Sequence, residues 1–311
     1  MKYFALVLLA TLTTCDSQKA VNLEAEKTPK TITIQGHRGC RGLLPENSIV
    51  AFEKAVELGV TAVEMDVVVS GDNRLVVSHE PWMSHVICFD PAGVPISELE
   101  EKSHNLYKLT LPEIQKYTFG QMGHPDYPDQ EAISCQKPSL AEVVNAVRNK
   151  AKAVNRPCPA FNIELKSAPE GEGVFVPSPD TYADIFLKEY FDLHYHGPLT
   201  VQSFDSRLLK VLHEKYPELQ LIYLVEAGLT PYEKHMDKLG FRPFGFSPHF
   251  SYVNDVLVRR CAADSVHLSV WTVNEEADLL RMMKMGVRDI ITDYPDRAIE
   301  LATKEGYVIA Q

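Results

Sequence analysis

Residues 31–59 read TITIQGHRGCRGLLPENSIVAFEKAVELG: a β-branched run, then a glycine-rich turn, then a helical pattern. β-branched residues favour a strand, and Asn47 or Ser48 can cap the helix that follows. Similar β-branched runs recur, mostly followed by helical patterns, at residues 31–34, 61–69, 161–165, 199–204, 219–225, 241–246, 266–273 and 288–292. Eight strands interleaved with helices predict an α/β fold, a closed parallel (β/α)8 TIM barrel.

One stretch interrupts this rhythm. RLVVSHE, residues 74–80, predicts an extra strand joined to the run at 61–69 by the turn-like SGDN. From there to a helix starting near Ser139 the chain is rich in prolines and aromatic residues. Structureless loops of that length are uncommon in compact domains. We therefore expect a small inserted subdomain at about residues 81–137.

The N-terminus, MKYFALVLLATLTTC, places one lysine before an apolar run that is too short to span a bilayer. It predicts a signal peptide over residues 1–14 and lipidation of Cys15, because LTTC resembles a bacterial lipobox. A cleaved signal without lipid and a buried N-terminal helix are the alternatives. Residues 15–30 predict a polar tether and residues 31–311 the folded body. We expect an exported protein of a bacterial periplasm or envelope, attached to the membrane only through this anchor.

Composition excludes some partners. The 311 residues are 45% apolar and 23% charged, which is ordinary for a globular protein. The formal charge is −11 and no run of lysine or arginine offsets it, so neither nucleic acid nor an anionic lipid surface is an expected partner. Five scattered cysteines follow Cys15 and do not form a disulfide framework, although an exported protein can form one or two bridges.

Acidic residues alternate with apolar ones in two of the predicted strands. In VEMDV, Glu64 and Asp66 are two residues apart, so both carboxylates point to one face. In FNIELK the same spacing places Glu164 and Lys166 on one face. Inward carboxylates repel unless a cation lies between them. Three carboxylates predict a site for Ca²⁺ or Mg²⁺, unless these are exposed edge strands with alternating charge.

Two histidines follow predicted strands, where barrel sites gather. His37 comes after TITIQG and His79 ends VVSHE. Together with Arg38, Lys166 and the carboxylates they form a plausible set for phosphoester cleavage, in which one histidine accepts a proton and the other donates one. A lone histidine is more often structural, and Glu46 is equally well explained as a first-turn acid of the helix that follows.

Eight motifs then occur in the order typical of one family: GHRG, PENS, VEMDV, VVSHE, NIELK, QSF, WTVN and GVRDIITDYP. Over residues 34–297 the chain resembles the glycerophosphodiester phosphodiesterase family. The resemblance implies a barrel with an insertion and hydrolysis of small glycerophosphodiesters to sn-glycerol 3-phosphate and an alcohol. It implies the general base His37 and general acid His79, the metal ligands Glu64, Asp66 and Glu164, and the substrate-binding residues Arg38, Glu46, Lys166 and Trp271.

Three motifs depart from the family pattern: PENS replaces PENT, GVRDIITD replaces GVDGIITD, and Glu80 follows His79 where the family usually has aspartate. If that acid orients His79, its longer side chain could loosen the ring. Two alternative functions remain at this point: a phospholipase acting on intact lipid, and a non-catalytic barrel that binds phosphodiesters.

Overall fold

The computed structural model describes residues 30–311. The predicted signal peptide at residues 1–14, the lipidation site Cys15 and all of the tether except Lys30 lie outside the described residues. Lys30 is the first residue of strand β1. Within residues 30–311, no helix combines the length and the apolar character that crossing a membrane requires.

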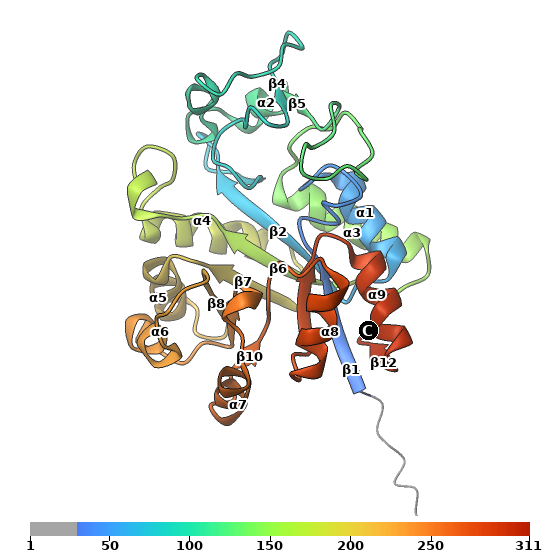
Figure 1. The fold of residues 1–311 in the computed structure, drawn as a ribbon. Helices are drawn as coiled ribbons and strands as arrows, with labels where there is room; N and C mark the ends of the chain where they lie inside the picture. The colour runs from blue at the N-terminus through green and yellow to red at the C-terminus, as the bar shows by residue number, and fades with distance from the viewer. Residues whose placement is uncertain (1–29) are drawn as a thin grey trace, which may run out of the picture.

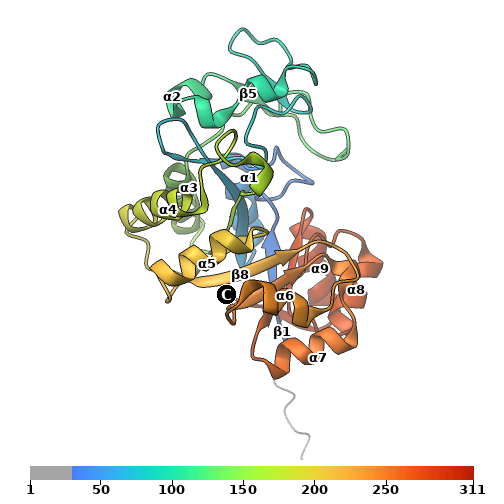
Figure 2. The same cartoon turned by 90° about the vertical axis from the view of Figure 1, so that its left-hand side faces the viewer.

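Eight parallel strands follow one another around the barrel in chain order. Figures 1 and 2 show these strands with helices packed around them. They are β1 (Lys30–Gly36), β2 (Ala62–Val69), β6 (Ala160–Leu165), β7 (Leu199–Ser203), β8 (Gln220–Val225), β9 (Gly245–Pro248), β10 (His267–Leu268) and β11 (Asp289–Thr292). Val270, just after β10, forms a parallel bridge with Ile290 of β11, and this bridge joins the two ends of the sheet. The predicted (β/α)8 class is confirmed.

Each barrel strand is followed in the chain by a helix of the outer layer. These helices are α1 (Ile49–Leu58), α3 (Leu140–Ala153), α4 (Pro179–Asp192), α5 (Ser206–Lys215), α6 (Tyr232–Leu239), α7 (Asp255–Ala263), α8 (Glu276–Lys284) and α9 (Pro295–Lys304). Ser48 caps α1 by accepting a hydrogen bond from the Ala51 N–H at 3.2 Å. Ser139 caps α3 in a reciprocal capping box with Glu142. The caps fix where the chain leaves each loop.

Three strands differ from the sequence prediction. The run at 241–246 forms a strand only from Gly245, because Pro243 has no N–H to donate to a ladder. The run at 266–273 pairs regularly over His267–Leu268 alone, and isolated bridges follow it. β12 (Tyr307–Ile309), which was not predicted, pairs with the first residues of β1.

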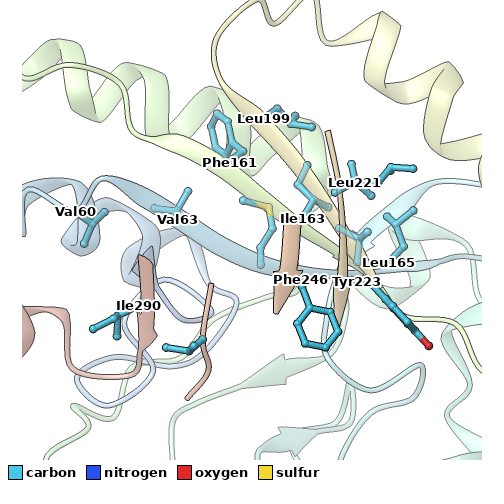
Figure 3. Packing of buried hydrophobic residues seen from close by; sticks show 14 of the residues in the cluster. Val60, Val63, Phe161, Ile163, Leu165, Leu199, Leu221, Tyr223, Phe246 and Ile290 are labelled. Atoms are coloured by element: carbon cyan, nitrogen blue, oxygen red, sulfur yellow. The ribbon is translucent and has the colours of Figure 1, made fainter. Parts of the chain in front are cut away.

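Side chains point alternately to the two faces of each strand, and this separates the residues of the hydrophobic core from the residues of the site. On β2, Val63, Met65 and Val67 belong to the main hydrophobic cluster, whereas Glu64 and Asp66 have the opposite orientation. Figure 3 shows part of this packing, with side chains contributed by neighbouring strands of the barrel. Labelled there are Val60, Val63, Phe161, Ile163, Leu165, Leu199, Leu221, Tyr223, Phe246 and Ile290.

The segment between β3 (Leu75–Val77) and α3 lies beyond the carboxyl end of β2 (Figure 1). β3 pairs antiparallel with β2. The segment contains the short helix α2 (Leu111–Ile114) and the two-stranded ladder of β4 (Cys88–Phe89) with β5 (Thr118–Phe119). Its apolar side chains form a second cluster, separate from the barrel core. We call residues 78–139 the insertion.

A polar layer crosses the barrel interior toward the amino ends of the strands. Gln35 donates to Asp289 at 2.7 Å and accepts from Asn162 at 2.9 Å. Thr200 donates to Asn162 at 3.0 Å, and His267 Nε2 lies 2.7 Å from the other oxygen of Asp289. Asp289 is one of the positions where GVRDIITD departs from the family pattern. Its buried carboxylate is therefore paired within this layer.

Candidate active site

Three buried carboxylates meet inside the barrel. Glu64 and Asp66 lie on β2 and Glu164 lies on β6, opposite Asp66 in the strand register. One oxygen from each lies within 4.8 Å of the others, and the residues are 1%, 1% and 7% exposed. This trio is the one such group of potential ligands found among residues 30–311. We call it the carboxylate triad.

The triad concentrates negative charge. Burial, Asp66 and Glu164 together raise the pKa of Glu64 well above its usual range. Burial also raises the pKa of Glu164, more than Lys166 lowers it. Asp66 behaves differently: burial raises its pKa, but Arg38 and other cationic neighbours lower it well below the ordinary value. One oxygen of Asp66, Oδ1, is buried without a hydrogen-bond partner among the described residues. An all-oxygen donor set of this kind fits a hard divalent cation.

Hydrogen bonds hold the triad in place. Asn47 donates to Asp66 Oδ2 at 2.9 Å, and Gln202 donates to Glu64 Oε1 at 3.1 Å. The backbone N–H of Arg38 donates to Glu64 Oε2 at 3.0 Å. Asn47 and Gln202 were not predicted as site residues. Asn47 lies in the motif PENS and Gln202 lies in the motif QSF. Their place in these motifs was the sequence signal that could have identified them as site residues.

The predicted phosphate-binding cations lie against the triad. Arg38 Nε is 3.3 Å from Asp66, and its Nη1 contacts both oxygens of Glu46 at 2.8 and 2.9 Å. Lys166 Nζ lies 2.7 Å from Glu164 Oε1. Glu46, which the resemblance implies as substrate-binding, pairs with Arg38, and its Oε2 lies 3.6 Å from Arg41 Nη1. The Glu46 and Asp66 carboxylates raise the pKa of Arg38 despite its burial, so it stays charged.

His37 is held by a residue that sequence reasoning missed. Its Nδ1 lies 2.6 Å from Asp293 Oδ1, and its Nε2 lies 3.9 Å from Glu64. Assigning the Nδ1 proton to this hydrogen bond leaves Nε2 as an acceptor. Burial lowers the pKa of His37 to about 4, although Asp293 acts in the opposite direction. The ring is therefore neutral near neutral pH.

Three further side chains donate hydrogen bonds to the Asp293 carboxylate. Arg41 contacts it at 3.0 and 3.2 Å, Asn274 donates at 2.7 Å, and Tyr127 of the insertion donates at 3.2 Å. Burial raises its pKa, but His37 and Arg41 lower it well below the usual range, so it remains a carboxylate. Arg41 had no assigned task in the sequence; here it helps to fix the partner of His37.

His79 follows β3 and is oriented by its neighbour. Its Nδ1 lies 2.6 Å from Glu80 Oε1. Burial raises the pKa of Glu80, but the hydrogen bond with His79 and the nearby cations lower it to about 2. The glutamate that replaces the usual aspartate thus reaches the ring and forms the orienting hydrogen bond.

Many of these groups line one cavity of about 740 Å³. Its polar lining includes both histidines, Arg38, Lys166, Glu64 and Glu164. Trp271 lines it too, as the resemblance implies; its indole N–H donates to the Ser247 carbonyl at 2.9 Å, and its ring packs edge-on against Phe204. Cys40 in the glycine-rich turn is fully buried and does not line the cavity, and burial raises the pKa of its thiol to about 12.

A barrel with a carboxylate triad, two cations and two carboxylate-held histidines at the carboxyl ends of its strands has the parts of a phosphoric diester hydrolase. The family model for the Glycerophosphoryl diester phosphodiesterase family matches residues 37–297, and the chain belongs to this family. Membership favours an enzyme over a non-catalytic binding barrel.

Relatives and solved structures agree with this assignment. The glycerophosphodiester phosphodiesterase of Caldanaerobacter subterraneus is 30% identical over 89% of this chain and 100% of its own length. That of Bacillus subtilis is 26% identical over 90% of this chain and 89% of its own length. A putative glycerophosphoryl diester phosphodiesterase from Silicibacter pomeroyi superposes with a TM-score of 0.79 at 25% identity, covering 91% of this chain and 96% of the other.

A phosphodiesterase from Oleispira antarctica, solved with the product sn-glycerol-3-phosphate, has a TM-score of 0.68 at 22% identity and covers 87% of this chain and 96% of its own. At that identity it supports the fold alone.

Proposed function

We propose that this protein hydrolyses glycerophosphodiesters to sn-glycerol 3-phosphate and an alcohol, with a divalent metal and with His37 and His79 as general base and general acid. One observation carries the proposal: two histidines, each held through Nδ1 by a carboxylate, line the same cavity as Glu64 and Glu164 of the carboxylate triad. The name of the Oleispira complex records the same product in a protein of similar fold.

Glu64, Asp66 and Glu164 would hold the metal. When bound, Ca²⁺ or Mg²⁺ supplies positive charge that polarises a phosphoryl oxygen. Arg38 and Lys166 are placed to bind the remaining phosphoryl oxygens, since both cations lie against the triad. The strongly acidic chain thus places two cations, Arg38 and Lys166, at the position where an anionic substrate needs them.

Proton transfer falls to the histidines. Neutral His37 accepts at Nε2 the proton of the attacking oxygen, which belongs either to water or to the neighbouring hydroxyl of the substrate. A bond forms from this oxygen to phosphorus, and the bond between phosphorus and the alcohol oxygen breaks. Protonated His79 then gives its proton to the departing alcohol oxygen, while Glu80 stabilises the charged ring. Asp293 keeps His37 in the tautomer that the first step requires. Attack by water gives sn-glycerol 3-phosphate directly. Attack by the substrate's hydroxyl gives a cyclic phosphodiester, and water then adds to its phosphorus and breaks one ring P–O bond to give sn-glycerol 3-phosphate.

Asp293→Asn is expected to lower kcat by about 10²-fold or more while KM changes by less than about threefold, because the ring loses the negative partner that fixes its tautomer. Steady-state kinetics with glycerophosphocholine measure both constants. Tyr127→Phe removes a single donor to Asp293 and serves as the control, with an expected loss below about tenfold. A kcat of Asp293→Asn close to the wild-type value would contradict the positioning role.

We further propose that the protein is exported to a bacterial envelope and anchored there through lipidated Cys15. The leader pattern of residues 1–15 supports this. Expressed in bacteria, the wild-type chain should accompany the membrane fraction, whereas Cys15→Ser should appear in the soluble exported fraction, because one residue carries the anchor. Retention of Cys15→Ser in the membrane fraction would refute lipidation at this residue.

A further inference from the structure

A buried lysine lies behind the turn that carries His79. Lys137, close to the end of the insertion, is only 5% exposed and does not line the cavity. Its Nζ donates a hydrogen bond to Ser78 Oγ at 2.8 Å and lies 5.2 Å from the centre of the Phe119 ring. Within residues 30–311, no salt bridge of 4.0 Å or less joins this ammonium to a carboxylate. The charge of Lys137 is therefore buried with few direct partners.

The nearby charge that compensates this ammonium belongs to Glu80. Taking a charge out of water is unfavourable unless other groups compensate it, and methionine could fill the space beside Phe119 without that cost. Burial raises the pKa of Glu80, and the charge of Lys137 acts with His79 and other cations in the opposite direction. The ammonium thus favours the ionised form of the carboxylate that holds the His79 ring.

We infer that Lys137 is a positioning residue for the general acid: through Ser78 it fixes the turn on which His79 and Glu80 lie. This rests on the proposed function, because it requires His79 to be the proton donor. Lys137 acts through this turn and not on the substrate, since its side chain lies outside the cavity lining.

A chain of hydrogen bonds joins Lys137 to the turn. Ser78 Oγ accepts from the ammonium and donates to the Glu80 carbonyl at 2.7 Å. His79 lies between Ser78 and Glu80, so this chain restrains the backbone on both sides of the histidine. Hydrogen bonds in series polarise one another, so the ammonium makes the Ser78 hydroxyl a better donor. With the backbone restrained, Glu80 Oε1 keeps its place 2.6 Å from His79 Nδ1.

Backbone hydrogen bonds fix both partners of this contact. The Ser78 N–H donates to the Asp66 carbonyl at 3.0 Å, which holds the turn against β2. The Val77 N–H donates to the Pro138 carbonyl at 2.8 Å, which holds the residue after Lys137 against β3. The lysine and the turn therefore meet between two paired segments, where a positioned side chain loses little further freedom.

The same contact closes the base of the insertion, because Ser78 is its first residue and Lys137 is close to its last. A lysine that only stabilises the insertion would affect every substrate alike when it is replaced. A lysine that positions the general acid affects the step in which His79 gives its proton to the departing alcohol. The two roles therefore differ in how the loss depends on the leaving group.

Lys137→Met is expected to lower kcat for glycerophosphocholine by about tenfold or more with less than about threefold change in KM, because proton donation slows while binding is kept. Glycerophospho-p-nitrophenol has a leaving group that departs without a proton, so its kcat should stay within about threefold of wild type. Steady-state kinetics with both substrates measure the difference. Equal losses on both substrates would assign Lys137 a structural role and overturn the inference.

Two further variants separate positioning from folding. Ser78→Ala cuts the hydrogen-bond chain without touching the lysine and should show the same dependence on the leaving group, so it serves as the test if Lys137→Met does not fold. Lys116→Met removes an exposed insertion lysine that does not line the cavity, and should change neither substrate. Thermal melting confirms that each variant is folded.

The His79→Ala background shows whether the lysine acts through this ring. There, Lys137→Met should cause no further loss on glycerophosphocholine, because the group that it positions is already absent. A further loss of about tenfold would overturn the inference. So would wild-type rates in both Lys137→Met and Ser78→Ala beside a strongly impaired His79→Ala, a result that leaves the proposed hydrolysis intact. Normal turnover of His79→Ala alone would instead refute the proposed role of His79 itself.

Discussion

His37→Ala and His79→Ala are each expected to lower kcat/KM for glycerophosphocholine by about 10²- to 10⁴-fold, the usual range for loss of a positioned general acid or base. Each ring is fixed at Nδ1 by a carboxylate and lines the cavity, so alanine removes the transferring nitrogen itself. Initial rates with purified, folded variants measure the effect.

A second substrate distinguishes the two roles. With glycerophospho-p-nitrophenol the leaving group departs without a proton, so His79→Ala should recover most of its loss and His37→Ala should not. His85→Ala is the matched control: this histidine pairs with Glu101 of the insertion and does not line the cavity. Near-normal turnover of either active-site variant on glycerophosphocholine would remove that histidine from the mechanism.

Addition of Ca²⁺ or Mg²⁺ to chelator-treated protein is expected to raise the melting temperature, since a ligand that binds the folded state alone stabilises it. At a metal concentration of about 100 Kd the gain is about 2.7 kcal/mol, or roughly 5 °C for a domain of this size. Glu64→Gln, Asp66→Asn and Glu164→Gln should each weaken or abolish this rise, together with activity.

The chelated proteins provide a second, independent readout. Burial and like charges raise the pKa of Glu64, so Glu64→Gln relieves repulsion and should melt no lower than chelated wild type. Glu226→Gln is the control, because Glu226 lines the cavity but lies outside the triad, and it should keep the metal response. A full metal-induced rise in all three triad variants would place the ion elsewhere.

Local periodicity was enough to foresee the triad. Side chains alternate between the two faces of a strand, so Glu64 and Asp66 must lie on the same face of β2 whatever their neighbours are. The same rule places Glu164 on one face of β6, where it pairs with Asp66 in the strand register. The barrel class followed for a similar reason: its signal is the repeated alternation of strand and helix, which each segment carries by itself.

Contacts between residues far apart in the sequence could not be predicted from such local patterns. Asp293 meets His37 only because β11 closes the barrel next to β1, a contact across 256 positions of the chain. Glu46 was expected to bind substrate, and its contact with Arg38 could not be foreseen because it depends on how the glycine-rich turn folds. β12 has only three residues and pairs with the start of β1, so no local sequence pattern predicted this strand.

The insertion joins the barrel between β3 and α3, whereas the carboxylate triad belongs to β2 and β6 and His37 follows β1. Apart from His79 and Glu80 at its start, the insertion is therefore a separate stretch of chain from the strands that carry the chemistry. Substitutions around Trp82, an insertion residue that lines the cavity, leave these strands unaltered, so this side of the cavity can be varied while the triad and His37 keep their positions. Tyr127 limits that freedom, because its hydrogen bond to Asp293 links the insertion to the carboxylate that holds His37.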